Sequence, residues 1–336
     1  MIKNIIKDAG LTFMLGLLFF ACSSPGKKDE KSSGQLEQKA QVKTPVFNAD
    51  SAYHYIDKQV GFGPRVPNTE THAQCALYLE SKMKRFGAEV IVQEADVVAF
   101  DNTVLKAKNI IAQFNPDKND RLLLFAHWDS RPFADHDADA SKHNSPIDGA
   151  NDGASGVGVL MEIGRQIGKA GIDMGIDIIF FDAEDYGQPD HLDLPYKEHT
   201  WCLGSQYWGK NPHRDGYYAR YGILLDMVGA ENALFFQELH SLQYAPELNQ
   251  HVWNIASDIG YGNHFVFEKG GMITDDHVYV NKYRNIPCVN IIQFNASSES
   301  SFGDFWHTHD DNMSNINRAT LKAVGQTVLE TIYRER

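Results

Sequence analysis

Short apolar runs alternate with amphipathic segments along most of this chain, and this alternation constrains its fold more than any other feature. Each run is four to six residues long and rich in Ile, Leu, Val and Phe. Such runs are typical of strands buried on both faces of a sheet. They occur at residues 109–114, 122–126, 176–181, 222–225 and 288–292.

The segments between these runs carry apolar residues every three or four positions, which predicts helices. Such helices are expected at residues 71–86, from 155 onward, at 246–259 and at 318–333. Strands separated by helices predict an α/β fold, with a twisted, mostly parallel central sheet covered by helices on both faces. The chain has 336 residues, of which 43% are hydrophobic, so we expect a single large domain at residues 47–336.

The charge of the chain is acidic, with a formal net charge of −13 and a pI near 5.5. Nucleic acids and anionic membrane surfaces attract basic proteins, so this charge argues against both as partners. A metal ion would offset part of the acidic excess if the acidic residues gather at one site.

The N-terminal residues have the pattern of a secretion signal. Lys3 and Lys7 precede an uncharged apolar run at residues 11–21. This run is too short to span a bilayer as a helix and has the length of the apolar part of a signal peptide. We therefore predict a signal peptide at residues 1–21.

Cys22 directly follows the small residue Ala21, which resembles the lipidation motif of bacterial lipoproteins. Residues 22–46 are polar and contain almost no apolar side chain, so they are expected to form a flexible tether behind a lipidated Cys22. The expected location is the bacterial cell envelope, on the periplasmic side or at the outer membrane, with the lipid as the only membrane contact. The alternative is an ordinary signal peptide, cleaved near Ala21, that leaves Cys22 as a free thiol.

Histidine and acidic residues follow several of the predicted strands at the point where each strand ends. In open α/β sheets, ligands bind beyond the carboxyl ends of the strands. Carboxylates gathered there repel one another unless a cation lies among them, and imidazole with carboxylate at an open position is the ligand set of catalytic zinc. The residues concerned are His127, Asp129, Glu184, Asp185 and Asp226, with Asn290 inside the last strand.

Two further motifs add candidate ligands. Asn151-Asp152-Gly153 leads into the helix predicted from Ser155, and a position near a helix N-terminus keeps Asp152 ionised; the same three residues also favour a simple turn. Trp306-His307 places a histidine beside a large aromatic side chain. At Glu184-Asp185, adjacent residues at a strand end point in different directions, so one carboxylate can bind metal while the other transfers protons.

Other motifs leave their role open. Asp275-Asp276-His277 follow Gly270-Gly271, which favours either a glycine-hinged loop that carries site residues or an exposed acidic turn. Trp201 and Trp306 fit either a core or the wall of a pocket. Serine hydrolysis is not supported, because the sequence Gly153-Ala154-Ser155-Gly156 does not match a nucleophile elbow.

Seven motifs in this chain resemble, in order and spacing, those of a known enzyme family. They are Phe62-Gly63-Pro64-Arg65-Val66-Pro67, Ala126-His127-Trp128-Asp129, residues 149–156, Phe181-Asp182-Ala183-Glu184-Asp185, Leu225-Asp226-Met227-Val228-Gly229-Ala230, Asp275-Asp276-His277 and Trp306-His307-Thr308. The family is that of the zinc-dependent glutaminyl-peptide cyclotransferases of the animal type, which also occur in some bacteria. It shares its fold with the zinc aminopeptidases, and the resemblance extends from about Ala49 to the C-terminus.

The resemblance implies conversion of the N-terminal glutamine of peptides or proteins to pyroglutamate, with release of ammonia. It implies one zinc ion per chain, bound by Asp152, Asp185 and His307. Glu184 would be the general acid and base, within a hydrogen-bond network that includes Asp226 and Asp275. Trp201 and Trp306 resemble the walls of the substrate pocket.

The chain departs from the animal enzymes at two positions of this set. Asp185 stands where they have glutamate, so the ligand is one methylene shorter and the backbone must come closer to the metal. Asn290 stands where they have histidine, and an asparagine can form hydrogen bonds but cannot take up a proton.

A two-zinc aminopeptidase is the main alternative, because the same residues match its ligand set: His127, Asp152, Glu184, Asp185, Asp226 and His307. In that case Asp152 would bridge two metals, and Glu184 would act as base for water. The motif Asp275-Asp276-His277 and the position of Trp306 directly before His307 favour the cyclotransferases. A lipoprotein that only binds peptides is a third hypothesis, but it would require a broken ligand set, and no proposed ligand is missing.

Overall fold

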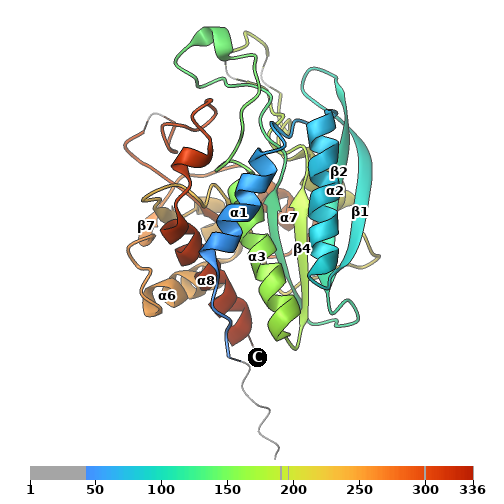
Figure 1. The fold of residues 1–336 in the computed structure, drawn as a ribbon, viewed down its shortest axis with the longest axis vertical. Helices are drawn as coiled ribbons and strands as arrows, with labels where there is room; N and C mark the ends of the chain where they lie inside the picture. Colours follow the sequence, from blue (N-terminus) through green and yellow to red (C-terminus); the bar gives the residue numbers. More distant parts are fainter. Residues whose placement is uncertain (1–42, 190, 196, 299, 336) are drawn as a thin grey trace, which may run out of the picture. The chain divides into compact units, whose positions relative to one another are not determined.

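A six-stranded sheet organises the part of the chain that the computed structural model describes, residues 43–189, 191–195, 197–298 and 300–335 (Figure 1). Its strand order is β1-β2-β4-β3-β5-β8. The four strands β3, β4, β5 and β8 are parallel, whereas β2 pairs antiparallel with both β1 and β4. The strands are β1 (Glu89–Val98), β2 (Val104–Phe114), β3 (Arg121–His127), β4 (Gly175–Phe181), β5 (Gly222–Asp226) and β8 (Cys288–Ile292).

Helices cover both faces of this sheet, as the sequence predicted. One face packs against α1 (Ala49–Val60), α2 (Glu70–Arg85), α3 (Ala154–Ala170) and α8 (Arg318–Arg334). The other packs against α4 (Leu203–Lys210) and α7 (Asp276–Arg284). The remaining elements are α5 (Leu239–Tyr244), α6 (Pro246–Asp258), the 3₁₀ turns η1 (Ala140–Lys142) and η2 (Met313–Asn315), and a small second sheet of β6 (Phe235–Gln237) and β7 (Phe265–Lys269).

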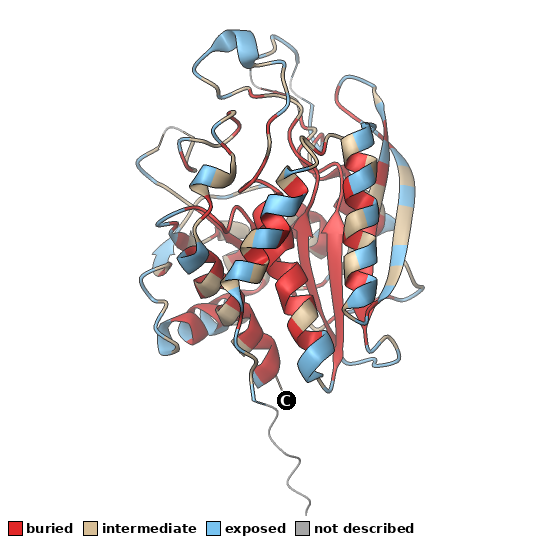
Figure 2. Cartoon of the chain, in the orientation of Figure 1, coloured by how far each residue is buried: buried red, intermediate tan, exposed pale blue. Residues whose placement is uncertain are grey.

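The strands of the main sheet bury alternate side chains in two cores. In β3, Leu122 and Leu124 face the core under α1, α2, α3 and α8, while Leu123 and Phe125 face the core under α4 and α7. A strand buried on both faces needs apolar residues at most positions. This explains why these strands appear in the sequence as nearly continuous apolar runs, and β3 is buried throughout (Figure 2). The polar exceptions have partners, since Asp177 in β4 pairs with Arg121 and Asn290 in β8 donates to Asp275.

All five predicted strands are present, and the mostly parallel sheet is confirmed, with an antiparallel pair added at one edge. The sequence pattern did not predict β1, because this edge strand exposes many of its side chains and its longest apolar run has only three residues, Val90-Ile91-Val92. It also missed α1, α4, α5 and α7, as well as the small β6–β7 sheet.

The predicted signal peptide, the lipidated Cys22 and most of the tether lie outside the described residues. Phe47 is buried in the main core and α1 begins at Ala49. Cys75, Cys202 and Cys288 are free and buried. Within the described ranges, no helix combines the length and the apolar character needed to cross a membrane.

Candidate active site

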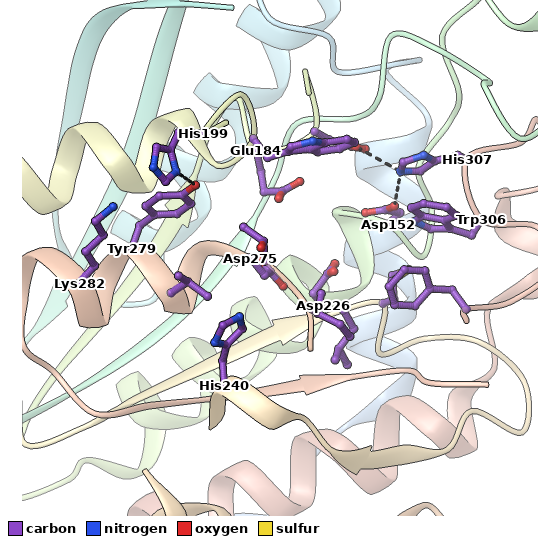
Figure 3. Close-up of a pocket in the computed structure, with 18 of the residues that line it drawn as sticks. Asp152, Glu184, His199, Asp226, His240, Asp275, Tyr279, Lys282, Trp306 and His307 are labelled. Atoms are coloured by element: carbon purple, nitrogen blue, oxygen red, sulfur yellow. Dashed lines mark hydrogen bonds and ion pairs between the residues drawn. The ribbon is translucent and has the colours of Figure 1, made fainter. Parts of the chain in front are cut away.

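A pocket of about 530 Å³ opens at the carboxyl ends of the parallel strands (Figure 3). This is where polar residues follow the strands in the sequence, so the sheet brings them together as predicted. All the predicted metal-binding, catalytic and substrate-binding residues line this pocket: Asp152, Glu184, Asp185, Trp201, Asp226, Asp275, Trp306 and His307.

The turn after β4 carries two of the acidic residues and is fixed by Asp129. The backbone N–H groups of Glu184 and Asp185 each donate to the Asp129 carboxylate at 3.1 Å. Ala183 adopts a left-handed conformation with φ of 52° at the start of this turn. The two neighbouring side chains then diverge, since Asp185 meets His307 whereas Glu184 accepts a hydrogen bond from the Cys202 thiol at 3.0 Å.

The turn before α3 holds Asp152 in a similar way. The Asp311 carboxylate accepts hydrogen bonds from the N–H groups of Asn151, at 2.7 Å, and Asp152, at 2.9 Å. Gly153 has φ of 98°, and a Cβ there would lie 2.5 Å from the Asp129 carbonyl oxygen. Only glycine fits this position. The turn predicted from Asn151-Asp152-Gly153 is therefore confirmed, and it is built around the site.

Asp152, Asp185 and His307 form a buried group whose potential ligand atoms all lie within 4.8 Å of one another. His307 Nε2 is 3.6 Å from Asp152 Oδ2 and 3.4 Å from Asp185 Oδ1. Ligands about 2.0–2.1 Å from a tetrahedral zinc ion lie about 3.3 Å apart. The observed spacings therefore match a shared zinc ion better than direct hydrogen bonds.

Two further observations support a cation within this group. Asp185 Oδ2 is buried and has no hydrogen-bond partner among the described residues. Burial, together with the neighbouring Asp152 carboxylate, raises the pKa of Asp185. Buried carboxylates that converge in this way favour a positive charge between them. The residues present thus fit the zinc ion expected from the sequence, and the shorter Asp185 side chain reaches the group.

His127, Asp152 and Asp226 form a second buried group beside the first. His127 Nε2 is 3.0 Å from Asp152 Oδ1 and 3.1 Å from Asp226 Oδ1, both hydrogen-bond distances. Although burial favours the neutral ring, hydrogen bonds to Asp129, Asp152 and Asp226 raise the pKa of His127 well above its ordinary value. At these distances the N–H at His127 Nε2 can be shared between the two carboxylates.

Glu184 lies in the middle of the pocket (Figure 3) and is only 8% exposed. Burial raises its pKa well above the ordinary value, and the carboxylates of Asp275 and Asp185 add to this effect against the opposing charge of His127. Burial and Asp152 likewise raise the pKa of the nearby Asp226 to about 8. These carboxyl groups therefore hold protons more readily than exposed ones do.

Asp275 joins this network from the N-terminus of α7. Its Oδ1 accepts from the Asp276 N–H at 2.6 Å, and its Oδ2 accepts from Asn290 Nδ2 at 2.7 Å. Asn290 thus serves as a hydrogen-bond donor. Of the two alternatives for Asp275-Asp276-His277, the loop that carries site residues holds for Asp275, which precedes α7 and lines the pocket, whereas Asp276 and His277 form the first turn of α7. The exposed turn is wrong, because all three residues are buried.

Trp201 and Trp306 both line the pocket near His307. The Trp306 ring stacks on that of His307, with centroids 3.6 Å apart, and the Trp201 ring is nearly parallel to it at 6.0 Å. A Cβ on Gly187 would lie 2.0 Å from the Trp201 ring, so this tryptophan packs directly on the Gly187 backbone. Both tryptophans are therefore pocket residues and not core residues.

The sequence did not indicate several residues that shape the site. Arg131, Asp135, Cys202 and Asp311 were not singled out. One signal was present, since Arg131 and Asp135 have the spacing of a helical ion pair, but no helix was predicted there. Their contacts form between distant segments, which local patterns do not reveal.

The fold and the site together define an α/β protein of the zinc aminopeptidase-like class. The chain belongs to peptidase family M28, whose model matches residues 109–332. Zinc is the metal that this fold implies, because a similar crystal structure, at 57% identity and a TM-score of 0.86, is that of a Zn-dependent exopeptidase from Parabacteroides distasonis. That match covers 88% of this chain and 100% of the other.

Glutaminyl cyclases are equally similar. The crystal structure of Tannerella forsythia glutaminyl cyclase has 56% identity and a TM-score of 0.86, over 87% of this chain and 100% of the other. The glutaminyl-peptide cyclotransferase of Bos taurus is 27% identical over 246 residues, 63% of this chain. This chain spans 62% of the length of that relative. Because similar structures carry both names, the choice between the activities depends on the site.

Proposed function

We propose that this protein is a zinc-dependent glutaminyl cyclase. It would convert the N-terminal glutamine of peptides and proteins to pyroglutamate and release ammonia. Similarity to Tannerella forsythia glutaminyl cyclase over 87% of the chain supports this activity. So does a pocket in which two tryptophans flank a candidate zinc group and a buried, unligated carboxyl group.

One observation carries the proposal: the two buried groups that share Asp152 have different spacings. His307 lies 3.4–3.6 Å from its carboxylate neighbours, as fellow zinc ligands do, whereas His127 lies 3.0–3.1 Å from its neighbours, as hydrogen-bonded groups do. The geometry therefore supports one zinc ion per chain. Cyclisation fits a single zinc site, because the peptide provides its own nucleophile.

Asp152, Asp185 and His307 would bind this zinc ion. When bound, zinc supplies Lewis-acid polarisation of the side-chain amide carbonyl of the substrate glutamine. Trp201 and Trp306 would enclose that side chain and exclude water from it. Both rings line the pocket and lie nearly parallel to that of His307.

Glu184 would transfer the proton during the reaction. The amino group of the peptide attacks the side-chain amide carbon, a C–N bond forms, and the original amide C–N bond breaks. Glu184 accepts the proton from the attacking nitrogen and returns it to the leaving nitrogen, which departs as ammonia. A raised pKa favours the second transfer, and the Cys202 thiol holds the carboxylate in place. Asp226 and Asp275 complete the network beside it.

A two-zinc aminopeptidase is the second candidate, because His127, Asp152 and Asp226 also converge within 4.8 Å. The two activities give different products from a peptide with N-terminal glutamine. We expect mass spectrometry to show a product lighter by one ammonia, and no change in the same peptide with an acetylated amino group. A product that lacks the whole glutamine residue would identify a peptidase instead.

The proposal includes attachment of the protein to the bacterial cell envelope through lipid on Cys22. It rests on the sequence alone, since residues 1–42 lie outside the described part of the chain. We expect Cys22→Ala to move the protein from the membrane fraction to the soluble fraction of the cells that produce it. Equal membrane association of both forms would contradict lipidation.

A further inference from the structure

Arg131 is a fully buried residue whose guanidinium group hydrogen-bonds to Asp135 and to Asp185, one of the candidate zinc ligands. Its Nε and Nη2 donate to the two carboxylate oxygens of Asp135 at 2.7 and 2.5 Å. Its Nη1 donates to the backbone carbonyl oxygen of Asp185 at 2.9 Å. A guanidinium that binds a carboxylate with two parallel hydrogen bonds is rigid and charge-assisted. Arg131 therefore fixes the position of Asp135 relative to Asp185.

Asp135 in turn meets His307 on the side away from the other ligands. Its Oδ1 is 3.1 Å from His307 Nδ1, and its side chain is 2% exposed. The other ring nitrogen, Nε2, faces Asp152 and Asp185. A carboxylate on the far nitrogen of a metal-binding histidine fixes its tautomer and orientation. With the proton held on Nδ1, Nε2 is free to bind a metal.

We propose that Arg131 and Asp135 are positioning residues, which hold His307 and Asp185 in the geometry that binds zinc. This inference rests on the proposed zinc site, but not on the reaction carried out there. Neither residue lines the pocket, so neither is expected to touch substrate. Their effect passes through the two ligands that they hold.

Arg131 also contacts Trp201, a residue of the pocket wall, whereas Asp135 makes no such contact within the described part of the chain. The centre of its guanidinium lies 4.5 Å from the Trp201 ring centroid, within the range of a cation–π contact. The Trp201 ring also packs directly on Gly187. Loss of Arg131 should therefore loosen Trp201 as well as the zinc ligands, whereas loss of the Asp135 charge should affect the ligands alone.

A matched control lies two residues further along the chain. Asp137 Oδ2 is 3.0 Å from His309 Nδ1, so this pair repeats the contact between Asp135 and His307. However, His309 is 34% exposed and does not line the pocket. Asp137→Asn thus makes the same chemical change, on the same segment, at a histidine outside the candidate zinc group.

The test measures zinc affinity in the full chain by competition with a chromogenic chelator, without substrate. We expect Asp135→Asn to weaken zinc binding about 10- to 100-fold, as for other residues that orient a metal-binding histidine. Asp137→Asn should leave it unchanged. The proposal fails if Asp135→Asn binds zinc as tightly as the natural protein, or if both variants weaken binding equally. Neither result depends on whether the protein is a cyclase.

Asp135→Asn removes the two short hydrogen bonds between Arg131 and a carboxylate. The only carboxylate contact then left to this buried guanidinium among the described residues is the longer one with Asp185 Oδ1 at 3.5 Å, which can destabilise the fold. The double variant Arg131→Gln with Asp135→Asn removes both charges together, and thermal melting without zinc reports its folding. We expect the folded double variant to bind zinc at least ~10-fold more weakly than the natural protein. At saturating zinc, we also expect its KM for a peptide with N-terminal glutamine to be raised, because Trp201 has lost its contact with Arg131. Unchanged zinc affinity in this variant would overturn the proposal.

Discussion

Replacing Glu184 by glutamine is expected to reduce turnover at least ~100-fold, the low end for loss of a general acid and base. Glutamine keeps the size of the side chain but cannot accept the proton of the attacking amine. Because Glu184 is not part of the candidate zinc group, the zinc content should not change. The measurement is the rate of ammonia release at saturating concentrations of a peptide with N-terminal glutamine.

The stability of this variant provides an internal control. Burial and the neighbouring carboxylates disfavour the ionised form of Glu184, so a neutral amide should not lower the melting temperature. The same substitution at Glu94, which is exposed on the edge strand β1, should leave activity unchanged. Near-normal turnover of Glu184→Gln would show that another group transfers the proton.

The sequence predicted the central part of the fold well, for a physical reason. Strands buried on both faces require apolar side chains at most positions, and such runs are visible without any tertiary information. β3 and β4 are examples, since every residue in them is buried. By contrast, β1 is mostly exposed or partly buried, and its large apolar residues fall into two short groups, Val90-Ile91-Val92 and Val97-Val98, separated by a mostly polar segment.

The site was predictable to the extent that it follows from the fold. His127, Glu184 and Asp226 come at or just after the ends of parallel strands, and such ends meet at one edge of a sheet. The sequence could not distinguish one zinc from two, because the two sets of ligands overlap at Asp152. The distances between the ligand atoms differ between a one-zinc and a two-zinc site, and these distances depend on how the turns that carry the ligands pack.

The supporting residues could not be predicted, because their partners are far away in the sequence. Asp311 fixes the turn at Asp152 although the two residues are 159 positions apart in the sequence. Arg131 is a charged residue in a loop, which usually indicates an exposed side chain. Its complete burial results from Asp135 and from the carbonyl group of Asp185, and this arrangement exists only in the folded protein.

The central claim is that one zinc ion, held by Asp152, Asp185 and His307, serves the cyclisation of N-terminal glutamine. Titration of the metal-free protein with zinc, while ammonia release from a peptide with N-terminal glutamine is followed, tests it most directly. Activity should rise linearly and level off at one equivalent of zinc per chain, and His307→Ala should remain inactive over the same range. A plateau at two equivalents, or full activity of the metal-free protein, would contradict the account.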